Sequence, residues 1–209
     1  MSPDHAGAAP RNEIVLVRHG ETEWSRSGRH TGRTDVPLTE RGREQAVALA
    51  EALGGRTFEL VLTSPLARAA DTARLAGFGE VAQTRPDLRE WDYGAYEGRT
   101  TADIREERPG WSLWRDDAPG GETAAEVAER ADRVIDELRS LDSDALVFAH
   151  GHLLRVLTAR WLRLEASDGR LFALDPATIS ILGYERETPV IRVWNMPLQT
   201  PSPANPRGS

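Results

Sequence analysis

The chain has 209 residues, a formal net charge of −7 and no cysteine. This length is enough for one α/β domain, and the lack of cysteine excludes disulfides, thiolate zinc sites and cysteine nucleophiles. The negative charge argues against nucleic acid or an anionic membrane as a partner. All 26 basic residues are arginine, which excludes a lysine Schiff base and a Walker A lysine. Without a long apolar run or a secretory-type start in residues 1–12, we expect a cytoplasmic protein.

The first half of the chain predicts three strands and two helices. In chain order we expect a mobile tail (residues 1–12), a strand (13–17), a helix (40–53), a strand (59–63), a helix (65–77) and a short strand (80–84). The first helix follows Thr39, carries apolar residues at helical spacing and ends at Gly54-Gly55. Ser64 is the predicted N-cap of the second helix, with Pro65 in its first position.

The second half continues the alternation after an irregular, aromatic-rich stretch. We expect a helix opened by the capping box of Thr123 and Glu126 and ending near Leu141, a buried strand (145–149), a helix (151–164), a hairpin of strands 178–185 and 190–195 with its turn at 186–189, and a mobile tail (196–209). Alternating strands and helices predict a three-layer α/β fold with a mostly parallel sheet and helices on both faces. Residues 13–195 form the single predicted domain.

Three predicted strands end in residues suited to binding an anion. Arg18-His19-Gly20 follows the first strand, Arg68 lies in the first turn of the helix after the second, and His150 directly precedes a helix. Ligands of open α/β sheets bind beyond the carboxyl ends of the strands, and helix N-termini favour anions. We therefore expect these residues to converge on a site for a dianion.

Phosphoryl transfer is the chemistry that this set favours. A neutral His19 can attack phosphorus through one ring nitrogen if a backbone carbonyl binds the other N–H and fixes the tautomer. Arg18 and Arg68 disfavour the imidazolium and neutralise phosphate oxygens in the transition state. His150, when protonated, adds a further donor.

The leaving alkoxide needs a proton, and Glu90 is the predicted acid. It stands in the run Arg89-Glu90-Trp91-Asp92-Tyr93-Gly94. The neighbouring Trp91 and an approaching phosphate both favour a protonated carboxyl group. Asp92 is the first substitute if Glu90 does not have this role.

These residues belong to a series of motifs. The chain carries Leu16-Val17-Arg18-His19-Gly20-Glu21-Thr22, the run 28–39, Ser64-Pro65-Leu66-Ala67-Arg68, Glu90-Trp91-Asp92-Tyr93-Gly94, Gly120-Gly121-Glu122-Thr123 and Ala149-His150-Gly151. In this order, and over nearly the whole domain, they resemble the histidine phosphatase (phosphoglycerate mutase-like) superfamily. The runs Trp24-Ser25 and His30-Thr31-Gly32, together with Glu90-Trp91-Asp92-Tyr93-Gly94, look most like the branch of bacterial acid phosphatases and sedoheptulose-bisphosphatase-like enzymes.

The resemblance implies a phosphohistidine intermediate on His19, formed without a metal. It also implies phosphate binding by Arg18, Arg68 and His150, proton donation by Glu90, and substrate contacts from Thr31, Gly32 and Gly151. Many members carry Asn where this chain has Ser25, whose shorter hydroxyl is the expected replacement contact.

Two other functions stay open. A cofactor-dependent phosphoglycerate mutase uses similar residues, although the run 93–101 departs from the usual mutase pattern and the following segment is short for a mutase insertion. The second alternative is a weakly catalytic module that binds phosphoryl ligands or proteins. The presence of both the nucleophile and the acid argues against it. We expect a phosphatase of small organic phosphates, sugar phosphates first.

The remaining residues give weaker indications. Arginines alternate with tryptophans over a predicted lid: Arg99, Arg105, Arg108, Arg115, Trp111 and Trp114. They could bind a sugar or a second phosphate. We favour the alternative of a solvated helix face with aromatic packing. His150 and His152 are too few for a metal site, and nearby arginine repels cations, so we expect no metal and no other cofactor. His152 is expected to shape the pocket and His30 to cover the loop. The expected partner is a small phosphate ester, not nucleic acid or membrane; a homo-oligomer is left open.

Overall fold

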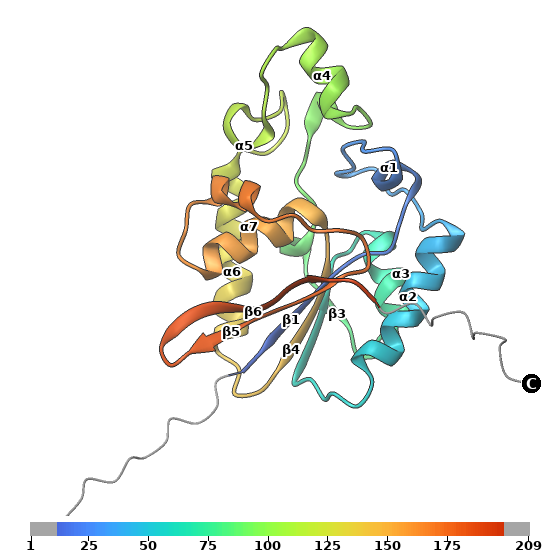
Figure 1. Ribbon diagram of the computed structural model, residues 1–209, viewed down its shortest axis with the longest axis vertical. Coiled ribbons are helices and arrows are strands. Elements are labelled where there is room, and N and C mark those ends of the chain that lie inside the picture. Colours follow the sequence, from blue (N-terminus) through green and yellow to red (C-terminus); the bar gives the residue numbers. More distant parts are fainter. Residues whose placement is uncertain (1–11, 199–209) are drawn as a thin grey trace, which may run out of the picture.

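A six-stranded sheet forms the centre of the molecule. The computed structural model describes residues 12–198. The strands are β1 (Ile14–Arg18), β2 (Leu60–Thr63), β3 (Gln83–Thr84), β4 (Ala145–Ala149), β5 (Ile179–Glu185) and β6 (Thr188–Met196), in the order β3-β2-β4-β1-β5-β6 (Figure 1). The first four in this order are parallel, whereas β5 and β6 pair antiparallel. The predicted α/β class with a mostly parallel sheet is confirmed.

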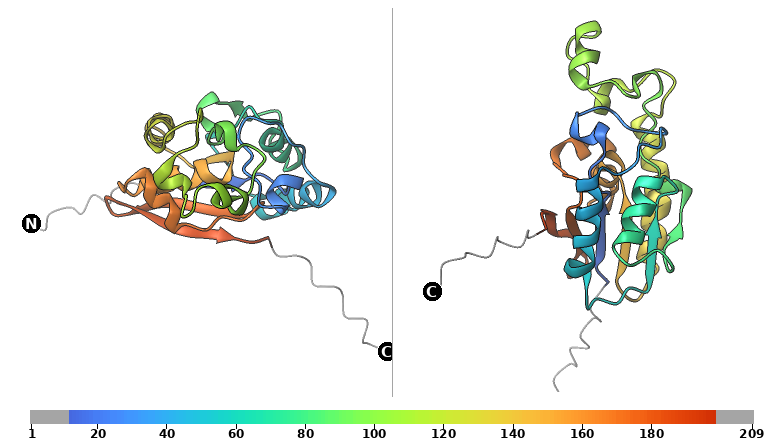
Figure 2. Two further views of the ribbon diagram at one scale, coloured as in Figure 1. Left: turned by 90° about the horizontal axis from the view of Figure 1, so that it is seen from above. Right: turned by 90° about the vertical axis from the view of Figure 1, so that its right-hand side faces the viewer.

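Helices cover both faces of the sheet. Helices α2 (Glu40–Leu53) and α3 (Ala67–Leu75) lie on one face, and α6 (Ala124–Arg139) and α7 (Gly151–Trp161) on the other (Figures 1 and 2). Alternate residues of β1 enter the two cores: Ile14 and Leu16 pack on the side of α6 and α7, Val15 and Val17 on the side of α2 and α3. This alternation of side chains across a strand explains why β1 is apolar throughout.

The carboxyl ends of the parallel strands carry the irregular part of the chain. Two short helices, α4 (Thr101–Glu107) and α5 (Leu113–Asp116), belong to residues 97–121, called here the cap segment, which stands beyond those strand ends (Figures 1 and 2). The other short elements are α1 (Glu23–Arg26) and the 3₁₀ turns η1 (Pro86–Leu88), η2 (Gly94–Tyr96) and η3 (Ala166–Leu171). Sequence periodicity did not predict these six elements, because each spans two turns or fewer.

The predicted N-cap of α3 is wrong. The helix begins at Ala67, three residues after Ser64, with Leu66 in the cap position. The carboxylate of Asp35 accepts from the Ala67 N–H at 2.9 and 3.0 Å, so a distant loop supplies the cap. The hydroxyl of Ser64 is within 2.7 Å of His150 Nε2 instead.

Other predicted boundaries also shift. The predicted strand 80–84 reduces to β3, because a tight turn at Phe78–Ala82 occupies its start. Helix α7 ends at Trp161, since Arg163 adopts a left-handed φ of 63°. Helix α6 ends at Arg139, two residues before the predicted end. The hairpin turn is shorter than predicted, and Pro189 lies within β6, where an edge strand tolerates a residue without N–H.

The ends of the described region are ordered parts of the domain. Asn12 is buried and its side chain donates to the carbonyl of Leu138 at 2.9 Å, and Met196 is the last residue of β6. The rest of the two predicted tails, residues 1–11 and 199–209, lies outside the described residues. Within residues 12–198, the helices are all too short or too polar to cross a membrane.

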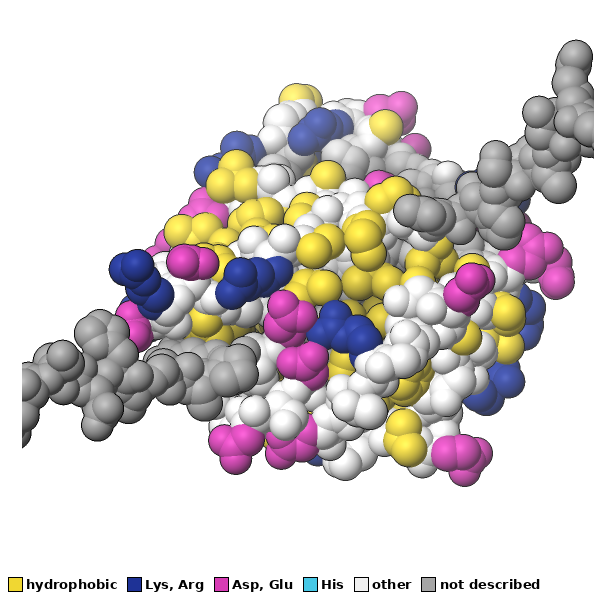
Figure 3. Space-filling view, turned by 60° about the horizontal axis from the view of Figure 1, so that its bottom comes forward, with side chains coloured by type: hydrophobic (Ala, Val, Ile, Leu, Met, Phe, Trp, Pro, Cys, Tyr) yellow, Lys and Arg dark blue, Asp and Glu magenta, His cyan; other side chains and the backbone are white. Residues whose placement is uncertain are grey.

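One face of the molecule exposes hydrophobic side chains in its middle, with arginines and carboxylates around them (Figure 3). Edge strand β6 has side chains of this kind that are only partly buried, among them Ile191 and Trp194. An interface between copies would cover such a surface. The homo-oligomer left open by the sequence stays a prediction.

Candidate active site

A cavity of about 230 Å³ opens at the carboxyl ends of β1 and β4. Its wall combines residues from both halves of the chain: Arg18, His19, Ser25, Gly28, Arg29, His30, Thr31, Glu90, Tyr93, Thr101, Gly151, His152, Arg155 and Leu174. Six of the nine predicted site residues line it. Arg68, His150 and Gly32 are not among the lining residues, and the side chains of Arg68 and His150 are fully buried.

His19 is held as a neutral base. Its Nδ1 is 2.7 Å from the carbonyl of Gly20. A carbonyl only accepts, so Nδ1 carries the proton and Nε2 keeps its lone pair. Burial, then Arg68 and Arg18, hold the pKa of His19 well below its usual range. Gly20 is needed here, because a Cβ would come within 2.4 Å of the Gly42 carbonyl at the start of α2.

Arg18 stands against the N-terminus of α7. One of its terminal nitrogens donates to the carbonyl of Leu174. A Cβ on Gly151 would lie 3.3 Å from the guanidinium carbon and from Nε, so Gly151 gives the arginine room. The guanidinium thus occupies the floor of the cavity next to His19.

Arg68 is completely buried and organises the loop that follows α1. Its terminal nitrogens donate to the carbonyls of Thr31, Gly32 and Thr34 at 2.9 to 3.0 Å. Thr31 lines the cavity, and its hydroxyl donates to the Arg29 carbonyl at 3.1 Å. Gly32 lines a smaller neighbouring cavity, and its N–H donates to Glu97. The loop residues that the resemblance implicates are therefore shaped by Arg68.

His150 is buried beside His19, with 5.1 Å between the ring centroids. Burial, then Arg68 and His19, hold the pKa of His150 well below its usual range. In the free protein these surroundings favour the neutral imidazole of His150. A neutral His150 still offers one N–H, and a bound dianion favours its protonation.

Three buried side-chain nitrogens have no hydrogen-bond partner within the described part of the chain: Arg18 Nε, Arg68 Nε and His150 Nδ1. The two arginine Nε–H groups are donors, and His150 Nδ1 is a donor when its Nε2 accepts from the Ser64 hydroxyl. A buried donor without a partner costs about 1–3 kcal/mol. These three belong to the residues predicted to bind phosphate. A tetrahedral dianion next to His19 matches their shared chemistry.

Glu90 lines the cavity with its carboxylate anchored by backbone N–H groups. Oε1 accepts from Trp91 and Leu153 at 2.9 Å, and Oε2 accepts from His152 at 3.0 Å. Two of these donors come from the first turn of α7, where free N–H groups point outward. The sequence did not reveal this anchoring, because it joins segments 62 and 63 residues apart.

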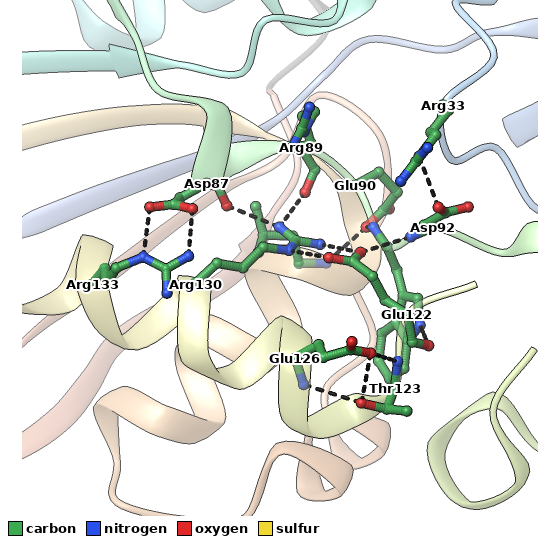
Figure 4. Close-up of polar contacts among 12 residues, drawn as sticks. Arg33, Asp87, Arg89, Glu90, Asp92, Glu122, Thr123, Glu126, Arg130 and Arg133 are labelled. Atoms are coloured by element: carbon green, nitrogen blue, oxygen red, sulfur yellow. Dashed lines mark hydrogen bonds and ion pairs between the residues drawn. The ribbon is translucent and has the colours of Figure 1, made fainter. Parts of the chain in front are cut away.

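A polar network holds the loop that carries Glu90 (Figure 4). Arg130 of α6 donates to the carbonyls of Asp87 and Arg89, and it pairs with Glu122 at 2.9 Å. Glu122 accepts in turn from the Asp92 N–H at 2.9 Å. The carboxylate of Asp92 is 2.7 Å from Arg33 and lies outside the main cavity (Figure 4). Its position does not favour Asp92 as the substitute acid.

The outer wall of the cavity is aromatic. Tyr93 OH is 2.7 Å from His152 Nδ1, and the His30 ring centroid lies 4.8 Å from that of Tyr93. Burial lowers the pKa of His30 to about 4, and burial with Arg155 holds the pKa of His152 well below its usual range. Ser25 also lines the cavity, while its hydroxyl bonds to the backbone of Thr22 in a capping box.

The arginines of the cap segment bind residues of that segment or the adjoining Tyr96, and they do not line the cavity. Arg99 pairs with Glu107 at 2.7 Å, Arg105 donates to the Trp111 carbonyl, Arg108 to Tyr96 OH, and Arg115 pairs with Asp116. These contacts agree with the favoured expectation of a surface with aromatic packing. Instead, Arg29 and Arg155 line the cavity, and sequence reasoning missed both.

Within residues 12–198, histidines and carboxylates do not gather in groups of three or more that could hold a metal ion. The donors around the cavity floor are guanidinium and imidazole groups, which suit an anion.

Comparison with known proteins places the chain in a family. It matches the histidine phosphatase superfamily (branch 1) over residues 14–197. An acid phosphatase of Mycobacterium tuberculosis is 44% identical over 178 residues, 83% of this chain and 87% of that protein. Sedoheptulose 1,7-bisphosphatase of Saccharomyces cerevisiae is 38% identical over 183 residues, 72% of this chain and 67% of that protein.

A solved structure of an open reading frame product from Mycobacterium tuberculosis has a TM-score of 0.86 at 41% identity, covering 90% of this chain and 99% of that one. The chain belongs to the histidine phosphatase superfamily, as its motifs indicated. Its relatives named phosphatases support a phosphatase enzyme.

Proposed function

We propose that the protein is a metal-independent phosphomonoesterase that forms a phosphohistidine on His19. The observation that carries this proposal is the set of three unpartnered buried nitrogens, on Arg18, Arg68 and His150, around a neutral imidazole. Guanidinium and imidazole N–H groups bind phosphate oxygens strongly. The tautomer fixed by Gly20 leaves His19 Nε2 free to attack phosphorus.

The reaction proceeds in two transfers. In the first, Glu90 is protonated, a state that the bound phosphate dianion favours. His19 Nε2 forms a bond to phosphorus while the ester P–O bond breaks, and the Glu90 carboxyl group gives its proton to the leaving oxygen and becomes a carboxylate. In the second, water attacks phosphorus, Glu90 takes a proton from that water, and the N–P bond breaks to release inorganic phosphate and restore His19. Arg18 and Arg68 neutralise the phosphoryl oxygens in both transition states, where this charge stabilisation supplies most of the catalysis.

Small organic phosphates, sugar phosphates first, are the proposed substrates. A cavity of about 230 Å³ suits a small ester, and its aromatic wall of His30, Tyr93 and His152 suits the apolar face of a sugar. The relatives named acid phosphatase and sedoheptulose 1,7-bisphosphatase support this class. The cytoplasmic location expected from the sequence stays a prediction.

Hydrolysis of p-nitrophenyl phosphate in the presence of EDTA tests the proposal. We expect turnover to persist with EDTA and to be abolished in His19→Ala. His5→Ala, which changes a histidine outside the described residues, is the matched control and retains the wild-type rate. Loss of activity with EDTA, or an unchanged rate in His19→Ala, contradicts the mechanism. Exchange of 2- and 3-phosphoglycerate that depends on bisphosphoglycerate would establish the mutase function instead.

A further inference from the structure

The loop of residues 31–34 is bound by side chains through both kinds of backbone group. Three of its carbonyl groups accept from the terminal nitrogens of Arg68 at 2.9 to 3.0 Å. Its three successive N–H groups, from Gly32 to Thr34, donate to the carboxylate of Glu97 at 2.9, 3.2 and 2.7 Å. Successive N–H groups that converge in this way form a concave site for an anion, and a side chain of the protein itself occupies it. One guanidinium and one carboxylate thus hold the loop between them.

Glu97 is fixed at the start of the cap segment by the backbone around it. It directly follows η2, and its N–H donates to the Gly94 carbonyl at 3.2 Å. The N–H of Gly98 donates to the His30 carbonyl at 2.8 Å, and the N–H of His30 donates to the Arg99 carbonyl at 2.9 Å. These bonds join the start of the cap segment to the residue before the loop. The Glu97 carboxylate is therefore kept within reach of the loop.

The chemistry of a carboxylate matches these three donors. Oε1 of Glu97 accepts from Gly32 and Thr34, and Oε2 accepts from Arg33. An ionised carboxylate only accepts, whereas a glutamine amide would place an NH₂ donor against at least one of the N–H groups. The ion pairs found among residues 12–198 do not include Glu97. The loop is thus the group that this carboxylate binds.

The loop in turn determines which nitrogen of Arg68 can bind a ligand. Both terminal nitrogens donate to loop carbonyls, and Nε has no partner within the described part of the chain. Asp35 is 3.9 Å from Arg68, which is too far for a hydrogen bond, so the loop holds the guanidinium. A planar guanidinium bound at both terminal nitrogens cannot turn without breaking those bonds. The loop therefore fixes the direction of the Nε–H group, one of the three buried donors of the proposed phosphate site.

We propose that Glu97 is a positioning residue of the phosphate site. Its carboxylate holds the N–H groups of the loop 31–34, the carbonyls of the loop orient the Arg68 guanidinium, and Arg68 Nε binds the phosphate beside His19. Glu97 does not line the cavity, so it acts on phosphate binding without touching the substrate. This inference rests on the proposed function, because it assumes that the phosphate to be cleaved is bound by Arg68 next to His19.

The test measures kcat/KM for p-nitrophenyl phosphate in Glu97→Gln, in Arg68→Met and in the double variant. We expect Glu97→Gln to lower kcat/KM by about 10- to 100-fold, because a small misplacement of a binding group has an effect of this size. The Ki of inorganic phosphate should rise in parallel. In the Arg68→Met background Glu97→Gln should cause a further loss of less than about threefold, because the guanidinium that it positions is absent. Losses that multiply in the double variant, or a wild-type kcat/KM in Glu97→Gln, overturn the inference.

The leaving group separates this role from an effect on Glu90. A Cβ on Gly32 would lie 2.7 Å from the Trp91 carbonyl, so the loop also packs against the run that carries Glu90. An effect through Arg68 should lower kcat/KM by the same factor for p-nitrophenyl phosphate and for butyl phosphate. A loss in Glu97→Gln that falls mainly on butyl phosphate would indicate impaired proton donation and overturn the inference.

Glu107→Gln is the matched control. Glu107 also belongs to the cap segment, but it pairs with Arg99 outside the cavity, and its variant should keep the wild-type kcat/KM. Glu97→Asp keeps an acceptor-only group that is one methylene shorter, so it should lose less than Glu97→Gln, and it replaces that variant in the comparison with Arg68→Met if Glu97→Gln does not fold. An unchanged rate in His19→Ala refutes the proposed function and the inference with it, whereas an inactive His19→Ala beside a fully active Glu97→Gln refutes the inference alone.

Discussion

Arg130 in the helix layer and Arg18 in the cavity floor are both shielded from water, but they differ in what surrounds their charge. Arg130 bonds to two carbonyls and pairs with Glu122 at 2.9 Å, which joins α6 to the loop before Glu90 (Figure 4). Arg18 bonds to one carbonyl, and its Nε has no partner within the described residues. The paired arginine stabilises the fold, whereas the unpaired one retains binding capacity for a ligand. All the basic residues of this chain are arginine. Whether an arginine stabilises the fold or can bind a ligand therefore depends on whether it pairs with a carboxylate.

The largest effect should follow from removing the unpaired charge. We expect Arg18→Met to lower kcat/KM for nitrophenyl phosphate by about 10³-fold, because it deletes a charged donor to the transition state. Its unfolding midpoint in urea should change little. Arg56→Met, which removes a guanidinium paired with Glu13 and Asp144, should show the opposite pattern, with a wild-type rate and reduced stability. If the rate of Arg18→Met is within tenfold of the wild-type rate, the distinction between paired arginines that stabilise the fold and unpaired arginines that bind the ligand is wrong.

Glu90 should matter most for poor leaving groups. We expect Glu90→Gln to lower kcat for an alkyl phosphate by about 10²- to 10³-fold and for nitrophenyl phosphate by much less, because nitrophenolate needs little protonation. Asp92→Asn is the comparison, since Asp92 pairs with Arg33 outside the cavity and should show no such selectivity. Equal losses for both esters in Glu90→Gln would assign proton donation to another residue.

Breaking the paired arginine should cost stability. Arg130→Met leaves Glu122 without its partner, and we expect the free energy of unfolding to fall by about 3 kcal/mol. The double variant Arg130→Met with Glu122→Gln should lose less than the sum of the two single variants, because it leaves no unpaired charge. Urea unfolding curves of the three variants measure this coupling. Additive losses would show that the pair is not the unit that holds the loop.

The histidines of the cavity should make stability depend on pH. The pKa values of His19, His30, His150 and His152 are all lowered in the folded protein, that of His30 to about 4. Below pH 6.5 the unfolded chain therefore binds more protons, so stability is full above this pH and falls as the pH drops toward 4. Urea unfolding at pH 7.5, 6.0 and 5.0 measures the slope, which should be shallower in His30→Gln. A slope that His30→Gln leaves unchanged would contradict the contribution of His30.

The lowered pKa of His19 also predicts that the pH dependence of the rate does not follow the titration of an ordinary histidine. The nucleophile should stay neutral well below pH 6.5, so the rate should not fall with an apparent pKa near that value.

The sequence predicted the sheet and the grouping of the proposed anion-binding residues for a common reason. Arg18 ends β1, and His19 and His150 directly follow β1 and β4, which pair in parallel and end at one edge of the sheet. Arg68 was placed correctly in the first turn of α3 although the predicted cap was wrong. Short-range patterns thus locate side chains to within a turn, which is enough to predict that they converge.

Local sequence patterns did not predict the contacts between segments that are distant in the sequence. The cap of α3 comes from Asp35, the anchor of Glu90 comes from the N–H groups of α7, and Arg155 becomes a cavity residue through the course of η3 and the cap segment. Each depends on how loops pack over the sheet, which local periodicity does not encode. The lowered pKa of His150 likewise follows from burial that appears only in the folded chain.

Acid-free quenching of the enzyme during turnover of ³²P-labelled substrate tests the central claim most directly. We predict one covalent label per active chain, stable in alkali and lost in acid as expected for phosphohistidine, located on His19 by peptide mapping and absent from His19→Ala. An enzyme that turns over without any covalent label, or that carries the label on another residue, would contradict the account.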